Sequence, residues 1–135
     1  MRMSEKSMFI VKPDAVERSL TGPIIARFEQ KGFRVRELKM FQFTTQQAEQ
    51  FYEVHREKPF FGELTSFMCS GPVVAAIIEG DHAISVVRIM IGVTKSFEAQ
   101  PGTIRGDYGL GFTDNVIHAS DSERSFEHES RVVFG

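Results

Sequence analysis

The sequence predicts a mixed α and β fold, in which amphipathic helices pack against a small sheet. Short apolar runs at Met8–Val11 and Pro72–Ile78 have the length and composition of buried strands. Stripes of apolar residues at helical spacing follow these runs, as at Ile24, Ile25 and Phe28. Glycine and proline separate the segments, which together predict the order β-α-β-α-β-α-loop-β-α.

The first part of the chain predicts one strand and one helix. The strand Met8–Val11 stops at Lys12-Pro13-Asp14, where we expect a loop. A helix is expected from Thr21, because Pro23 fits the first turn of a helix, and Gly32 is suited to end it.

A second strand and a second helix are expected next. Residues 33–43 are strand-like, and their alternation slips between Glu37 and Leu38, which predicts a bulge there. Thr44 and Gln47 have the spacing of a capping box, which predicts that a helix begins there. The inner face of this helix would use Ala48, Phe51, Tyr52 and His55.

The middle of the chain predicts a central strand between two helical segments. Glu63–Met68 is expected to form one or two helical turns, and Pro72–Ile78 a continuous buried strand. After a turn at Gly80-Asp81, a helix is expected that ends at Gly92.

The last part of the chain begins with a long segment, residues 93–115, that has no clear periodicity. A loop of this length in a compact domain is usually functional or mobile. A strand signal returns at Val116-Ile117, and the capping-box spacing of Ser120 and Glu123 predicts a last helix from near Ser120.

Two sheet arrangements fit this order of elements. One is a split βαβ core with four strands and helices on one face, and the other is a doubly wound sheet. Periodicity alone does not separate them.

Length and composition limit the classes of function. The 135 residues fit a single domain, residues 1–135, and the formal net charge of −2 gives no general attraction to nucleic acid or an anionic membrane. One cysteine excludes an internal disulfide. We find neither a secretory signal nor a membrane-spanning run, so a cytoplasmic location is expected.

His118 is the histidine best placed for chemistry. It follows an apolar strand and precedes the small residues Ala119 and Ser120, so a substrate could reach it. An imidazole accepts a phosphoryl group through one ring nitrogen while the other holds its proton, and a carboxylate is needed to fix that tautomer. Glu129 is a candidate if the last helix folds back over the strand end.

Three basic residues could stabilise a phosphoryl group in transfer: Lys12, Arg88 and Arg105. Each alone could equally be a solvated surface charge. The chain has neither a P-loop nor the glycine pattern of a Rossmann fold, so a nucleotide would bind in another geometry.

Residues 115–121, Asn-Val-Ile-His-Ala-Ser-Asp, resemble the phosphohistidine signature of nucleoside diphosphate kinases. Other segments look like the same family in the same order: residues 10–16, 27–29, 59–61, 67–73 and 101–107. The resemblance covers residues 7–134, and several ordered motifs are far more specific than one.

This resemblance implies an α+β fold, a ferredoxin-like (βαββαβ) antiparallel four-stranded sheet with helices added around it. It implies a ping-pong reaction: a nucleoside triphosphate phosphorylates His118, and a nucleoside diphosphate then takes the phosphate. Broad base specificity and maintenance of nucleoside triphosphate pools follow from the family. Mg²⁺ is expected on the nucleotide phosphates, with no metal site in the protein.

By similarity, each family role falls on a residue of this chain. Glu129 and Ser120 would orient His118. The phosphates would be held by Lys12, Tyr52, Arg88, Thr94 and Arg105. Lys12 and Asn115 would contact the ribose hydroxyls, and Phe60 would stack on the base without reading its edge.

Three features depart from the family pattern. Ala119 replaces a common glycine, which is harmless only if φ there is negative. Thr94-Lys95-Ser96 lacks a proline that is frequent in the family. Without it the unfolded chain has more conformational entropy, which lowers the stability of the loop by about 0.4–1 kcal/mol. The chain ends at Gly135, and among the expected homo-oligomers, tetramer or hexamer, this short end favours the tetramer.

Three alternatives stay open from the residues. A catalytically silent relative would bind nucleotide only. A nucleic-acid-binding module on the same sheet would need aromatic strands and a basic face, which the sequence does not indicate. A protein-histidine phosphotransfer partner would use His118 toward a protein acceptor.

Overall fold

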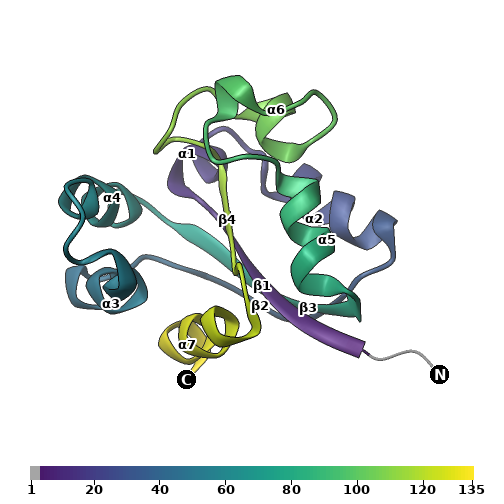
Figure 1. Cartoon of the computed structure of the whole chain (residues 1–135), viewed down its shortest axis with the longest axis horizontal. Coiled ribbons are helices and arrows are strands. Elements are labelled where there is room, and N and C mark those ends of the chain that lie inside the picture. The colour runs from purple at the N-terminus through teal and green to yellow at the C-terminus, as the bar shows by residue number, and fades with distance from the viewer. Residues whose placement is uncertain (1–3) are drawn as a thin grey trace.

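A four-stranded antiparallel sheet forms the centre of the structure, a computed structural model that describes residues 4–135 (Figure 1). The strands are β1 (Ser4–Val11), β2 (Arg34–Phe41), β3 (Val73–Asp81) and β4 (Ile117–Ala119), in the order β2-β3-β1-β4. β1 is antiparallel to both β3 and β4, and β3 is antiparallel to β2. The α+β, ferredoxin-like prediction is therefore confirmed, and the doubly wound alternative is wrong.

One face of the sheet is covered by α2 (Thr21–Lys31) and α5 (Ala83–Ile91) (Figure 1). Alternate residues of β1 point to this side, and the ring of Phe9 stacks on that of Phe28 at a centroid distance of 4.4 Å. Gly32, with φ of 118°, ends α2 as predicted, because glycine adopts the left-handed conformation without steric cost.

The opposite face carries the added helices α3 (Thr45–Phe51), α4 (Phe61–Met68) and α7 (Glu123–Phe134). Met8 and Ile10 of β1 are buried under them, together with Phe51. The capping box predicted for Thr44 and Gln47 is present. Helices therefore cover both faces of the sheet, and His118 of β4 lies on the side of α3 and α7.

Short helices occupy two segments that the sequence predicts as loops. The chain turns at Lys12 directly into α1 (Pro13–Glu17), because Pro13 fits the first helical turn. The long segment after α5 contains η2 (Ser96–Glu98) and α6 (Ile104–Tyr108). Thr103 caps α6 by accepting a hydrogen bond from the backbone N–H of Gly106. η1 (Glu53–His55) follows α3.

Two predicted boundaries are wrong. The register shift in β2 lies between Val35 and Glu37, earlier than the predicted bulge. The last helix begins at Glu123, and its capping box uses Ser122 and Ser125. Ser120 cannot cap it, because its hydroxyl and backbone N–H are engaged with Glu129 and Met8.

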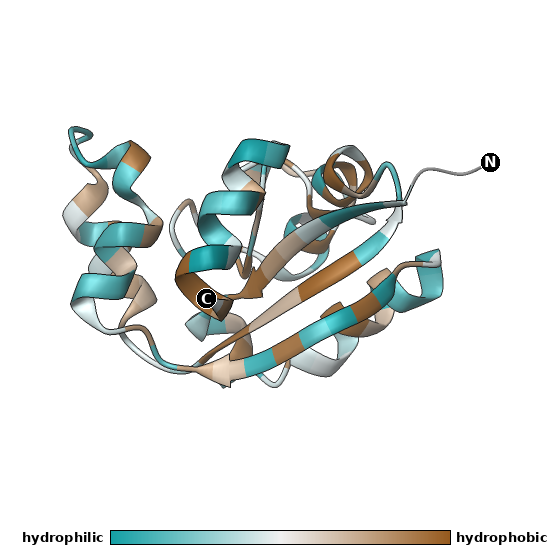
Figure 2. Cartoon of the chain, turned by 90° about the horizontal axis from the view of Figure 1, so that it is seen from below, coloured by the Kyte–Doolittle hydropathy of each residue, from teal (hydrophilic) through white to brown (hydrophobic). Residues whose placement is uncertain are grey.

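Hydropathy differs between the central and edge strands (Figure 2). The central strand β3 is buried over Val73–Ile78, whereas the edge strand β2 is mostly exposed and alternates between hydrophilic and hydrophobic residues. No helix within residues 4–135 has the length and apolar character needed to cross a membrane.

Candidate active site

His118 lies on β4 at the edge of the sheet, opposite Ile10 of β1. Its ring meets two aromatic rings of α3 and its C-cap edge-on: Phe51 at a centroid distance of 5.0 Å and Tyr52 at 5.8 Å. These rings fix one side of the imidazole, and the side chain keeps 19% of its exposure. The histidine is thus held by packing but remains reachable.

Glu129 of α7 orients the imidazole of His118. The distance from His118 Nε2 to Glu129 Oε1 is 2.9 Å, and the hydroxyl of Ser120 donates to the same oxygen at 2.8 Å. An ionised carboxylate only accepts hydrogen bonds, so Nε2 carries the ring proton. Nδ1 then holds a free lone pair, and it has no hydrogen-bond partner within residues 4–135. The predicted link from Glu129 and Ser120 to His118 is therefore present.

Lys12 lies at the end of β1 and is almost fully buried. Its ammonium donates to Asn115 Oδ1 at 2.7 Å and to the carbonyl oxygen of Thr113 at 3.1 Å. Asn115 in turn donates to the carbonyl oxygen of Thr94 at 2.9 Å. Burial, with repulsion from Arg105, lowers the pKa of Lys12 to about 7. Lys12, Asn115 and Thr94 thus form one connected group.

Arg88 of α5 and Arg105 of α6 both hold the backbone that carries His118. Arg88 donates to the carbonyl oxygen of Ala119 at 3.2 Å, and Arg105 to that of Ile117 at 2.7 Å. Burial, with repulsion from Arg88, lowers the pKa of Arg105 to about 10. The two cations therefore bind the residues directly before and after His118. An anion bound near both of them would offset their mutual repulsion.

Val116 has a left-handed backbone conformation, with φ of 66°. A β-branched residue in this region costs about 1–3 kcal/mol and needs support from its surroundings. The backbone N–H of Val116 donates to Asp14 Oδ2, and its carbonyl oxygen accepts from the N–H of Lys12. The turn before β4 is thereby tied to the start of α1. Ala119 is not among the residues with positive φ, so its replacement of glycine is unstrained.

A row of rings extends away from His118 toward the surface. The centroid of His55 lies 6.3 Å from Tyr52 and 5.5 Å from Phe60, and Phe60 lies 6.3 Å from Phe112. The hydroxyl of Tyr52 and the Nδ1 of His55 are buried without a hydrogen-bond partner within residues 4–135. Burial, with the charge of Glu129, raises the pKa of Tyr52 and keeps its phenol protonated as a donor.

Sequence reasoning missed two parts of this site. The support of Asp14 for Val116 has no local sequence signal, because it joins residues about a hundred positions apart. Phe112 lies in a segment without periodicity, and its position beside Phe60 depends on the tertiary fold. All predicted site residues fall in this region: Lys12, Tyr52, Phe60, Arg88, Thr94, Arg105, Asn115, His118, Ser120 and Glu129.

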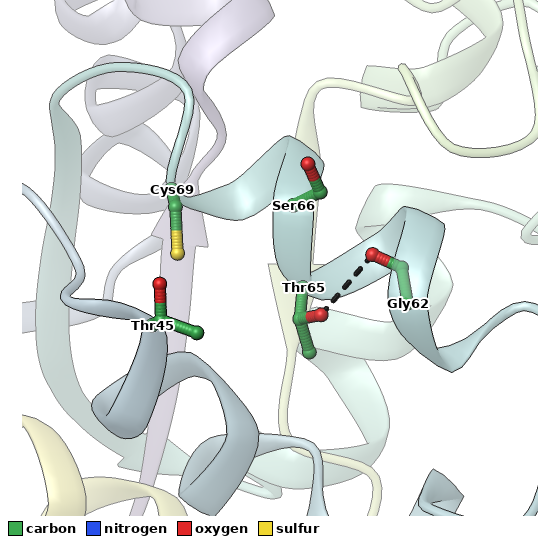
Figure 3. Close-up of a pocket in the computed structure, with 5 residues that line it drawn as sticks. All are labelled: Thr45, Gly62, Thr65, Ser66 and Cys69. Carbon is green, nitrogen blue, oxygen red and sulfur yellow. Dashed lines mark hydrogen bonds between the residues drawn. The ribbon is translucent and has the colours of Figure 1, made fainter.

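Two cavities lie apart from His118. One, of about 280 Å³, lies between α3 and α4, where the side chains of Thr45 and Cys69 face each other (Figure 3). Burial raises the pKa of the Cys69 thiol. The other, of about 520 Å³, lies between α1 and the turn at Gly71. Neither brings together a nucleophile, a base and cations, so the histidine cluster is the better candidate.

A sequence model of the family described as nucleoside diphosphate kinase matches residues 5–135. The chain belongs to the nucleoside diphosphate kinase family. The enzyme of Hyperthermus butylicus is 58% identical over 130 residues, which are 96% of this chain and 92% of that relative. The relative from Staphylothermus marinus is 56% identical over 97% of this chain and 93% of its own length.

Solved nucleoside diphosphate kinases have the same fold. The Aquifex aeolicus structure has a TM-score of 0.96 and 50% identity, and the match covers 98% of this chain and 96% of that one. The Halobacterium salinarum enzyme, solved in complex with CDP, has a TM-score of 0.95 and 42% identity over 98% and 88%. The chain is accordingly a kinase that transfers phosphate between nucleoside triphosphates and diphosphates. The catalytically silent alternative is wrong.

Proposed function

We propose that His118 carries the transferred phosphate in a ping-pong reaction, through Nδ1. The observation that supports this most directly is the bond from Nε2 to Glu129, which leaves Nδ1 as the unprotonated nitrogen. Nδ1 would attack the γ-phosphorus of a nucleoside triphosphate, an N–P bond would form, and the P–O bond to the diphosphate would break. A second diphosphate would reverse the step through its own terminal oxygen.

The cations beside His118 would stabilise the phosphoryl group in transfer. Its charge is spread over the equatorial oxygens, so fixed positive groups around it lower the barrier. Arg88 and Arg105 already bind the backbone on either side of His118, and Lys12 is close enough to Arg105 to feel its charge. Tyr52, protonated and without a partner, would donate to a phosphate oxygen, and the exposed Thr94 would add a contact.

Contacts to the sugar and base would follow outward from the phosphates. Lys12 and Asn115, joined at 2.7 Å, would bind the ribose hydroxyls. Phe60, partly exposed at the start of α4, would stack on the base. A phenyl face does not distinguish the hydrogen-bonding edges of bases, so this arrangement favours broad base specificity.

Mg²⁺ would be bound mainly by the phosphates and water. Mg²⁺ keeps several of its waters and is usually held by one or two carboxylates together with substrate phosphates, so the nucleotide would bring the ion. The ion would neutralise phosphate charge when bound, while the protein groups orient the histidine.

We also propose that the enzyme is a homo-oligomer, tetramer or hexamer. β2 is an edge strand, and its residues Leu38 and Met40 are 54% and 62% exposed. An edge strand with exposed apolar side chains is a template for pairing with another chain. A cytoplasmic location stays a prediction.

The role of His118 as phosphate carrier is tested by running the first half of the reaction and then measuring the mass of the intact protein. The protein is incubated with ATP and Mg²⁺, freed of nucleotide and weighed. We expect one acid-labile, base-stable phosphate that disappears on addition of GDP and never forms on His118→Ala. Matched His82→Ala should be phosphorylated normally. A folded protein that takes up no phosphate, or a phosphate that persists in His118→Ala, would contradict the proposal.

A further inference from the structure

His128 of α7 forms an exposed hydrogen bond to the end of α3. Its Nε2 lies 2.8 Å from the backbone carbonyl oxygen of Gln50. A carbonyl oxygen only accepts hydrogen bonds, so Nε2 carries a proton and donates. Gln50 lies in the last turn of α3, where the carbonyl oxygens lack the N–H partner that a further helical turn would supply. The imidazole of His128 therefore provides a donor to the open end of this helix.

The two residues that this bond joins are direct neighbours of residues that contact the catalytic imidazole. Glu129, the next residue of α7, lies 2.9 Å from Nε2 of His118. Phe51 and Tyr52, the next residues at the end of α3, meet the ring of His118 edge-on at centroid distances of 5.0 Å and 5.8 Å. The bond therefore connects the helix that supplies the carboxylate to the helix end that supplies two aromatic rings.

The two helices differ in how they are held at this point. A capping box orders the start of α7, and near its end the carbonyl oxygen of Val133 accepts from the ammonium of Lys39 of β2 at 2.7 Å. Within residues 4–135, no side chain other than His128 donates a hydrogen bond to the last turn of α3. Loss of this bond should therefore displace the end of α3, which carries Tyr52, and leave α7 in place.

We propose that His128 is a positioning residue for the phosphate transfer, because its bond to Gln50 fixes the end of α3 and with it the hydroxyl of Tyr52. This inference rests on the proposed role of Tyr52 as a donor to a phosphate oxygen. Such a bond needs an oxygen separation of about 2.5–3.0 Å and a good angle, so a small shift of the helix end weakens it. A misplacement of about 1 Å by a distant mutation can lower a rate by about 100-fold. The restraint that one hydrogen bond provides corresponds to about 3- to 10-fold.

The test is the rate of phosphohistidine formation at saturating ATP and Mg²⁺, followed by the mass of the intact protein. The final extent of phosphorylation counts the folded enzyme, whereas the rate reports the geometry of the site. For His128→Ala we expect the full extent and a rate that is about 3- to 10-fold lower. His128→Gln places an amide nitrogen where Nε2 lies and should restore the rate, whereas the shorter His128→Asn should not. Arg124→Ala, an exposed change on the same helix, should leave the rate unchanged.

A double-mutant cycle with Tyr52→Phe separates positioning of the hydroxyl from general support of the fold. Tyr52→Phe alone should lower the rate, and adding His128→Ala to it should change the rate by less than about twofold. Three results would overturn the inference: an unchanged rate in His128→Ala, a His128→Gln variant as slow as His128→Ala, or an equal effect of His128→Ala with and without the Tyr52 hydroxyl. An unchanged rate in Tyr52→Phe would reject the role of Tyr52 and the inference together. In each of these outcomes the phosphohistidine still forms, so they are distinct from a failure of the carrier.

Discussion

The carboxylate of Glu129 faces the imidazole of His118 across the junction of α7 and β4, at 2.9 Å from Nε2. In the proposed reaction, phosphorylation of Nδ1 with Nε2 still protonated would make the ring cationic, so the negative charge of Glu129 would be needed most after the transfer. The Ser120 hydroxyl, fully buried, holds the same carboxylate oxygen and limits its rotation. We therefore expect one acidic residue to set the tautomer before the reaction and to offset charge after it.

Glu129→Gln tests the importance of that charge. The amide oxygen can still accept a hydrogen bond from Nε2–H, but a bond to a charged group, worth about 1.5–3 kcal/mol, becomes a weaker neutral one. We expect kcat/KM to fall about 10- to 100-fold and the phosphohistidine to form more slowly in a single turnover. Glu127→Gln, an exposed change of the same type on the same helix, should leave both unchanged. Equal rates in the two variants would argue against a role for the Glu129 charge.

We expect Lys12 to make the binding of nucleotide sensitive to pH. Its pKa is about 7 in the folded protein and 10.5 ordinarily, so the unfolded chain binds more protons between these values. The contribution of Lys12 to the free energy of unfolding therefore rises as the pH increases from about 7 to 10.5. Below pH 7 the ammonium is charged in both the folded and the unfolded protein, so folding bears the full free-energy cost of burying that charge. An anionic ligand reverses that cost, because it favours the charged form.

The measurement is proton uptake on binding of ADP at pH 8, obtained from calorimetric heats in buffers of different ionisation enthalpy. With a pKa of about 7, Lys12 is mainly neutral at pH 8 in the free protein, and phosphates bound beside it would raise this pKa. We expect uptake of up to about one proton per bound ADP in the unmodified protein. Lys12→Gln should abolish the uptake, while the exposed Lys31→Gln should retain it. Proton release, or uptake that survives Lys12→Gln, would show that another group titrates.

The parts that sequence could predict are those with a local pattern. Buried strands such as Val73–Ile78 and the capping box of Thr44 carry their own signals. The last helix begins later than the spacing of Ser120 and Glu123 predicts, because the Ser120 hydroxyl is bound to Glu129, a contact that only the fold creates. Likewise, Ser96 donates its N–H to Gly111, a bond that the proline of the family pattern could not make. The predicted site residues lie in or near ordered motifs, whereas the position of Phe112 beside Phe60 depends on the three-dimensional arrangement.

Gly106 shows how tightly α6, which carries Arg105, is packed. A Cβ atom at this position would overlap the carbonyl oxygen of Gln100 and approach within 2.6 Å of its carbonyl carbon. Both are backbone atoms, which cannot rotate away as a side chain could. The same residue donates its N–H to the capping hydroxyl of Thr103, so a displacement would also disturb the start of α6. Gly62 of α4, in contrast, has open space around the corresponding position.

Gly106→Ala and Gly62→Ala should therefore have opposite effects on stability. Overlap at Gly106 should lower the free energy of unfolding by about 1–3 kcal/mol. Because the strain moves Arg105 away from the carbonyl of Ile117, kcat/KM should fall as well. Alanine at Gly62 restricts the unfolded chain and suits a helix, so it should raise stability by about 0.5–1 kcal/mol and leave activity unchanged. Urea denaturation compares the two, and a Gly106→Ala variant as stable and active as the parent would mean that α6 can shift without cost to the site.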